Sequence, residues 1–138
     1  MRIFLDANIC LDLLDTTRST SVASIAWYMQ HKDDSSLLFY FSGDFITTFY
    51  YILTERKRVQ ADKVIAAIDA LAAEIEPFYL NHADFQAAKE SFFARKADDF
   101  EDLMILHSAL RAKCDRFLTG DRKLLDLGML QGMRIEGV

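Results

Sequence analysis

Four aspartates of this sequence could do chemistry together if the fold gathers them. One ends the first apolar run, two stand three residues apart at the start of a helical pattern, and one follows a later apolar run: Asp6, Asp99, Asp102 and Asp121. Carboxylate and water oxygens are the ligands that Mg²⁺ and Mn²⁺ prefer. A held ion lowers the pKa of a water molecule and stabilises charge on a phosphate. The pattern therefore indicates a metal site able to hydrolyse phosphodiester bonds.

These acids need strands that end side by side, and the apolar pattern predicts such a sheet. Short apolar runs indicate strands over residues 3–5, 37–41, 75–80, 116–119 and 133–136. Helical patterns fill the intervals, over residues 8–15, 17–31, 45–58, 61–75, 81–96, 98–113 and 122–127. Strands that alternate with helices predict a three-layer α/β/α domain with a central, mainly parallel sheet of four to five strands. Ligands bind at the carboxyl ends of such strands, where Asp6 and Asp121 would lie.

The helix predicted over residues 17–31 carries apolar side chains at helical spacing. Val22, Ile25, Ala26 and Met29 recur every three or four residues. We therefore expect this side of the helix to be buried in the core.

The composition fits one globular domain that covers residues 1–138. Hydrophobic residues make up 51% of the chain and charged residues 27%, whereas a disordered chain would hold far fewer apolar residues. The apolar stretches are too short to span a bilayer, and the first of them contains an acid, unlike a secretory signal. Two cysteines without a CxxC pair favour buried thiols over zinc or disulfides. We expect a cytoplasmic protein with no membrane contact.

The formal net charge of −5 argues against attraction of nucleic acid by overall charge. Either nucleic acid is not the partner, or the acids are concentrated where metal ions neutralise them. The local distribution of charge, and not its sum, decides between these alternatives.

Each acid also has a purely structural interpretation. An aspartate at a helix start is often only a cap, and an aspartate after a strand is often only a turn residue. The joint placement favours a site over four unrelated caps. Asp6 weighs most, because an apolar strand so early in the chain has little structural need for a carboxylate at its end.

Three segments together resemble the PIN-domain family. Residues 5–12 look like its opening motif, an apolar strand followed by D-x-N and a helix. Residues 99–103, with Ala109 seven residues beyond Asp102, look like its third motif. Residues 117–121 look like its fourth motif, a strand followed by T-x-D. The order and spacing agree over essentially the whole chain.

The resemblance implies a Mg²⁺- or Mn²⁺-dependent ribonuclease, and small proteins of this kind are often VapC-type toxins of type II toxin–antitoxin pairs. It therefore implies an RNA substrate, an antitoxin protein as partner and a homodimer. The residues that it implies as catalytic are the metal-binding acids Asp6, Asp102 and Asp121 and the additional acid Asp99. It implies Asn8 and Thr119 as supporting side chains that orient the carboxylates.

The sequence departs from the family at one position. The family usually carries a glutamate early in the helix after the second strand, and Thr48 occupies that position here. A hydroxyl supports a metal-held water without adding negative charge. Asp44, one turn earlier, is a candidate substitute, whereas Glu55 lies about 10 Å along the helix axis from Thr48 and is too far away.

Basic residues offer two possible contacts with RNA phosphates. Arg56 and Arg58 belong to the one dense basic cluster, and Arg122 and Lys123 directly follow Asp121. The alternative for each pair is a solvated helix end or turn.

Three hypotheses follow for the function. The leading one is a metal-dependent endoribonuclease. The second is a catalytically weak or inactive PIN-like domain that binds RNA or protein, motivated by the missing glutamate. A metal-dependent phosphatase or receiver-like domain is less favoured, because the D-x-D or phospho-acceptor arrangement of such folds is not evident.

Overall fold

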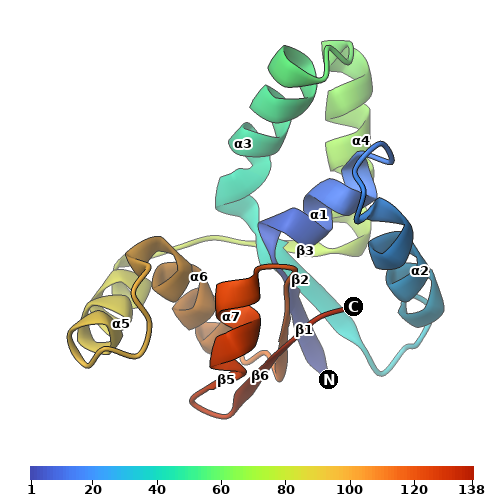
Figure 1. Ribbon diagram of the computed structural model, residues 1–138. Helices are drawn as coiled ribbons and strands as arrows, with labels where there is room; N and C mark the ends of the chain where they lie inside the picture. Colours follow the sequence, from blue (N-terminus) through green and yellow to red (C-terminus); the bar gives the residue numbers. More distant parts are fainter.

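All strands of the chain lie in one sheet. The computed structural model describes residues 1–138 (Figure 1). Its strands are β1 (Arg2–Leu5), β2 (Leu38–Ser42), β3 (Glu76–Phe78), β4 (Arg116–Leu118), β5 (Met129–Leu130) and β6 (Met133–Glu136). They lie in the order β3-β2-β1-β4-β6-β5, parallel except for β5, which runs antiparallel to β6.

Seven α-helices accompany the sheet. They are α1 (Ala7–Leu14), α2 (Ser21–His31), α3 (Ile46–Tyr51), α4 (Ala61–Glu74), α5 (His82–Phe93), α6 (Phe100–Arg111) and α7 (Arg122–Leu127). No helix combines the length and the apolar character that crossing a bilayer requires.

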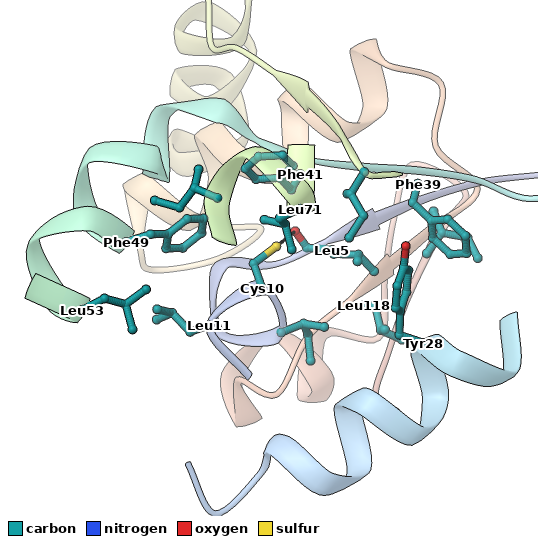
Figure 2. Packing of buried hydrophobic residues seen from close by; sticks show 14 of the residues in the cluster. Leu5, Cys10, Leu11, Tyr28, Phe39, Phe41, Phe49, Leu53, Leu71 and Leu118 are labelled. Carbon is teal, nitrogen blue, oxygen red and sulfur yellow. Dashed lines mark hydrogen bonds between the residues drawn. The ribbon is translucent and has the colours of Figure 1, made fainter. Parts of the chain in front are cut away.

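The helices cover both faces of the sheet, and the strand side chains alternate between them. In β1, Ile3 and Leu5 pack with α1 to α4, whereas Phe4 packs with α5, α6 and α7. Figure 2 shows the first of these clusters, to which Leu5 and Leu118 of adjacent strands and Cys10 and Leu11 of α1 contribute. Successive strand residues point to opposite faces, so two separate apolar layers form on one sheet. The predicted three-layer α/β/α fold with a mainly parallel sheet is confirmed.

The sheet has six strands rather than the expected four to five. The additional strand is β5, whose two residues form a hairpin with β6. Gly128 before it has φ +73° and Gly132 after it has φ +86°, a conformation that glycine adopts without a steric penalty. So short a run carries no periodicity, which is why the sequence did not indicate it.

The helix predicted over residues 45–58 is divided into three segments. A 3₁₀ turn (Gly43–Phe45) precedes α3, and a π-helical segment (Ile52–Arg56) follows it. The hydroxyl of Thr54 donates to the carbonyl of Tyr50 at 2.7 Å, which competes with the regular backbone hydrogen bonds of the helix. The segment ends at the tip of the α3–α4 pair that lies farthest from the sheet (Figure 1).

The predicted buried face of α2 was wrong. Val22 and Met29 are 79% and 57% exposed, Ala26 is exposed, and Ile25 is only half-buried. The buried positions are instead Ser21, Ser24 and Tyr28. Two of these are serines whose hydroxyls donate to Asp12 of α1, so polar contacts rather than apolar spacing orient this helix.

Candidate metal centre

The carboxyl ends of β1 and β4 bring two predicted site segments together. Leu5 pairs with Leu118 in parallel register, and the backbone N–H of Asp6 donates to the carbonyl of Leu118 at 2.9 Å. Asp6 therefore lies beside Thr119, although the two are 113 residues apart in sequence.

The Thr119 hydroxyl is the centre of a hydrogen-bonded group. Thr119 is 1% exposed, and its hydroxyl donates to Oδ2 of Asp6 at 2.7 Å. The same hydroxyl accepts from the backbone N–H of Asp121 at 3.0 Å and from the Asn8 amide at 3.4 Å. Asn8 also donates to Oδ2 of Asp6 at 3.2 Å and accepts from the N–H of Gly120 at 2.9 Å. One hydroxyl and one amide thus tie the D-x-N segment to the T-x-D segment.

Three of the four predicted acids are helix caps as well. Oδ1 of Asp6, Asp99 and Asp121 accepts a backbone N–H at the start of α1, α6 and α7, at 2.8, 3.0 and 2.9 Å respectively. The structural interpretation of these acids is therefore correct as far as it goes. A cap uses one carboxylate oxygen and fixes the side chain, which leaves the second oxygen oriented for another partner.

The acids act on one another electrostatically. Burial and the negative charges of acidic neighbours together raise the pKa of Asp102 to about 6. Burial has the largest effect, followed in order by the charges of Asp99, Asp121, Asp6 and Glu101. Burial also raises the pKa of Asp6, and the negative charge of Asp121 adds to this rise. Hydrogen bonds from Thr119, Ala7 and Asn8 lower the pKa but do not outweigh the rise. The five ion pairs of the protein include none of the four predicted acids. The cluster therefore has a deficit of positive charge.

This donor set suits a hard divalent cation, because it consists of carboxylates with a neighbouring hydroxyl and amide. As the side chains stand, no three His, Cys, Asp or Glu residues form a group that could hold a metal ion. The chemistry and the electrostatics of the site fit a cation, and ligation would require the carboxylates to draw closer together.

The position of the missing glutamate remains without an acid. Thr48 is exposed on α3, and its hydroxyl makes no hydrogen bond within the chain. Asp44, the candidate substitute, accepts instead from the backbone N–H of Leu80 at 2.8 Å and from the Ser42 hydroxyl at 3.4 Å. It fixes the segment that leads from β3 to α5. Glu55 lies exposed in the π-helical segment beyond α3.

The predicted basic contacts fall in two different places. Lys123 is exposed at the start of α7 and lines a cavity of about 400 Å³ together with Asp99 and Asp102. Arg122, its neighbour, is exposed. The segment that carries Arg56 and Arg58 lies at the tip of the α3–α4 pair, away from the sheet (Figure 1). The structure therefore brings Lys123 to the acids and leaves Arg56 and Arg58 apart from them.

A second cavity, of about 660 Å³, opens beside Asp121. Its wall includes Asn8, Thr119 and Asp121 and continues to the α1–α2 connection. There Asp12, only 2% exposed, binds Arg18, a residue that the sequence did not indicate. One signal was present in the sequence: a carboxylate between leucines on the apolar side of a short helix needs a buried partner.

Comparisons with known proteins agree with this architecture. A family model described as "PIN domain" matches residues 2–123. The fold is similar to VapBC2 from Rickettsia felis bound to a DNA fragment from their promoter, with a TM-score of 0.69 and 13% identity over 100% of this chain and 99% of that chain. It is also similar to VapC20 of Mycobacterium tuberculosis, a toxin that cleaves the sarcin–ricin loop, with a TM-score of 0.69 and 13% identity over 96% and 98% of the two chains.

A third similar structure is VapBC-1 from nontypeable Haemophilus influenzae, with a TM-score of 0.68 and 17% identity over 99% of this chain and 98% of that chain. No curated protein sequence matches this chain. At these identities, the solved structures describe the fold alone.

Proposed function

Since this chain belongs to the PIN-domain family, we propose that it is a Mg²⁺- or Mn²⁺-dependent endoribonuclease, the toxin of a type II toxin–antitoxin pair. The observation that carries the proposal is the group of acids at the carboxyl ends of β1 and β4. Burial and the charge of Asp121 raise the pKa of Asp6, and burial and the charges of the other acids raise that of Asp102. No ion pair within the chain compensates these acids. Uncompensated carboxylates are costly to gather unless a cation joins them.

The proposed roles follow from the contacts of each side chain. Asp6, Asp102 and Asp121 would hold the ion, with Asp99 beside Asp102. A bound ion supplies an activated water and stabilises charge on the scissile phosphate. Thr119 and Asn8 orient Oδ2 of Asp6. Lys123 lies where it can contact a phosphate of the substrate near Asp102.

The toxin role rests on fold similarity and on the nature of one neighbour. VapC20 is a toxin that cleaves an RNA loop, which makes RNA the first substrate to test. The VapBC neighbours support an antitoxin partner for this chain, and we propose a homodimer as its quaternary state.

The direct test is cleavage of labelled single-stranded RNA and of total bacterial RNA by the purified protein. We expect products with millimolar Mg²⁺ or Mn²⁺ and none after chelation by EDTA. Cleavage that persists in EDTA would contradict the metal dependence. RNA that stays intact under every metal condition would contradict the nuclease function itself.

The second candidate function is an RNA- or protein-binding module without cleavage. It is favoured by one observation, the exposed Thr48 where the family usually carries a glutamate. The variant Thr48→Glu separates the two candidates. If the native chain binds metal weakly for want of this acid, Thr48→Glu tightens Mn²⁺ binding and increases cleavage, whereas the matched Thr48→Gln does neither. If the wild type cleaves fully and Thr48→Glu changes nothing, the module hypothesis is removed.

A further inference from the structure

The connection between α1 and α2 is built around one buried carboxylate. Asp12 accepts at Oδ1 from Nε of Arg18 at 2.7 Å and from the Thr20 hydroxyl at 2.6 Å, and at Oδ2 from the Ser24 hydroxyl at 2.5 Å. The Ser21 hydroxyl donates to its backbone carbonyl at 2.7 Å. Asp12 thereby ties together four residues of the connection and of the start of α2.

This arrangement fixes Arg18 by one of its three nitrogens. Only Nε donates to Asp12, and neither terminal nitrogen makes a hydrogen bond within the chain. The Arg18 side chain is 31% exposed and lines the cavity of about 660 Å³. A guanidinium held through Nε presents its two terminal NH₂ groups in a fixed orientation, which suits recognition of a phosphate.

The cavity extends from Arg18 to Asp121, one of the four site acids. Asn8, Thr119 and Asp121 line one part of it, and Arg18, Thr20 and Ser24 line another. Arg18 is the only cationic side chain in its wall. Its volume lies within the range of ligand-binding cavities.

We propose that this cavity binds the RNA strand next to the scissile phosphate, with Arg18 contacting a neighbouring phosphate and Asp12 acting as the positioning residue. The proposal rests on the proposed function for the nature of the ligand. It also answers the problem of the net charge of −5. The attraction for the RNA backbone is local, from Arg18 in this cavity and Lys123 beside Asp102, rather than a property of the whole surface.

The test measures binding and cleavage of a short fluorescein-labelled single-stranded RNA of mixed sequence. Binding is followed by fluorescence anisotropy with Ca²⁺ in place of Mg²⁺, with RNA integrity checked on a gel. We expect Arg18→Gln to weaken binding about tenfold and to reduce the slope of log affinity against log salt by about 0.7, the contribution of one phosphate contact on a single strand. In cleavage, KM rises while kcat stays close to that of the wild type.

The matched control is Arg134→Gln. Arg134 is exposed on β6 and pairs in register with Arg116, at the amino ends of the strands and so away from the site. It should bind RNA as the wild type does. Arg18→Lys keeps the positive charge but lacks the two terminal NH₂ groups of the guanidinium, so its RNA affinity should lie between those of the wild type and Arg18→Gln.

Removing Arg18 alone leaves Asp12 buried without its cation, so a folding defect must be separated from a binding defect. The double variant Asp12→Asn/Arg18→Gln removes both charges, and we expect near-native thermal stability with the RNA affinity still reduced. RNA affinity of either Arg18→Gln variant equal to that of Arg134→Gln would overturn the proposal, as would a wild type that binds no RNA. If the wild type binds RNA through Arg18 but cleaves none, the nuclease function fails and this subsite stands.

Discussion

The two ends of helix α1 hold aspartates of opposite character. At its start, burial and the nearby charge of Asp121 raise the pKa of Asp6, although three hydrogen bonds act to lower it. Near its end, burial also acts to raise the pKa of Asp12, but hydrogen bonds from Arg18, Ser24 and Thr20 and the charge of Arg18 outweigh it, and the pKa falls below its ordinary value. A helix start favours an anion and a helix end disfavours one, so the helix dipole would produce the reverse order.

The difference lies in the partners. Asp12 is paired with Arg18, and Asp84 of α5 is paired with Arg111 of α6 through two hydrogen bonds of 2.9 Å. Asp6 and Asp102 have acids as their charged neighbours instead. We infer that the arginine partners of Asp12 and Asp84 compensate these two buried acids within the fold, whereas the gathered acids Asp6 and Asp102 have no such partner and serve a cation from solution.

The largest expected effect comes from changing Asp6, an acid without an arginine partner. Asp6→Asn keeps a side chain that can cap α1 but removes the central carboxylate of the site. We expect cleavage of RNA to fall to background while the circular dichroism spectrum and melting temperature remain near those of the wild type. Asp69→Asn, which changes an exposed acid of α4, is the control and should cleave normally. RNA cleavage by Asp6→Asn at the level of the wild type would contradict the proposed metal-dependent nuclease site.

The paired acids should behave in the opposite way. Asp84 is 2% exposed, and Arg111 also donates to the carbonyl of Tyr79 at 2.6 Å. Asp84→Ala leaves Arg111, whose side chain is 32% exposed, without its anion, and also removes the hydrogen bond from the Asn81 N–H. We expect a loss of about 1–3 kcal/mol of unfolding free energy. Urea denaturation measures this loss. The Mn²⁺ affinity of the folded variant should equal that of the wild type. A weakened affinity would contradict the inference that Asp84 plays no part in holding the cation.

The group around Thr119 predicts an intermediate effect. Thr119→Val removes the hydroxyl that orients Asp6 and receives the N–H of Asp121, whereas Thr119→Ser retains it. Loss of an outer partner of a metal ligand lowers activity about 10–100-fold. We expect this loss in the valine variant, measured as kcat/KM for RNA cleavage with saturating Mn²⁺, and near-native activity in the serine variant. Equal activities would mean that the hydroxyl orients nothing of importance.

The smallest expected effect is a change in pH dependence. The pKa of Asp102 is about 6 in the folded protein against an ordinary 3.8, so the folded state takes up the proton more readily than the unfolded state. The stability that this proton provides is complete below pH 3.8 and is lost as the pH rises through 6. Asp102→Asn should therefore melt higher than the wild type at pH 7 in EDTA, by an amount that shrinks toward pH 4.

Added Mn²⁺ sharpens the same measurement. It should raise the melting temperature of the wild type more at pH 7 than at pH 5, because the ion competes with the proton for Asp102. A melting temperature of Asp102→Asn that follows the wild type at every pH would contradict the mutual repulsion of the acids.

Much of the fold could be predicted from the sequence, because it depends on local periodicity. The alternation of apolar strands with helices, and the rule that ligands bind at the carboxyl ends of parallel strands, placed Asp6 and Asp121 at one edge of the sheet. The buried face of α2 was beyond such reasoning, since it is decided by Ser21 and Ser24 reaching Asp12 of another helix. Arg18 was missed for the same reason: only the folded connection reveals which cation a buried acid holds.

Anomalous diffraction from crystals of the protein soaked in MnCl₂ tests directly whether these acids hold a cation. We expect one or more manganese peaks among the carboxylates of Asp6, Asp102 and Asp121, with those side chains drawn closer together than in the present structure. Crystals with the three carboxylates accessible to solvent and no manganese between them would contradict it.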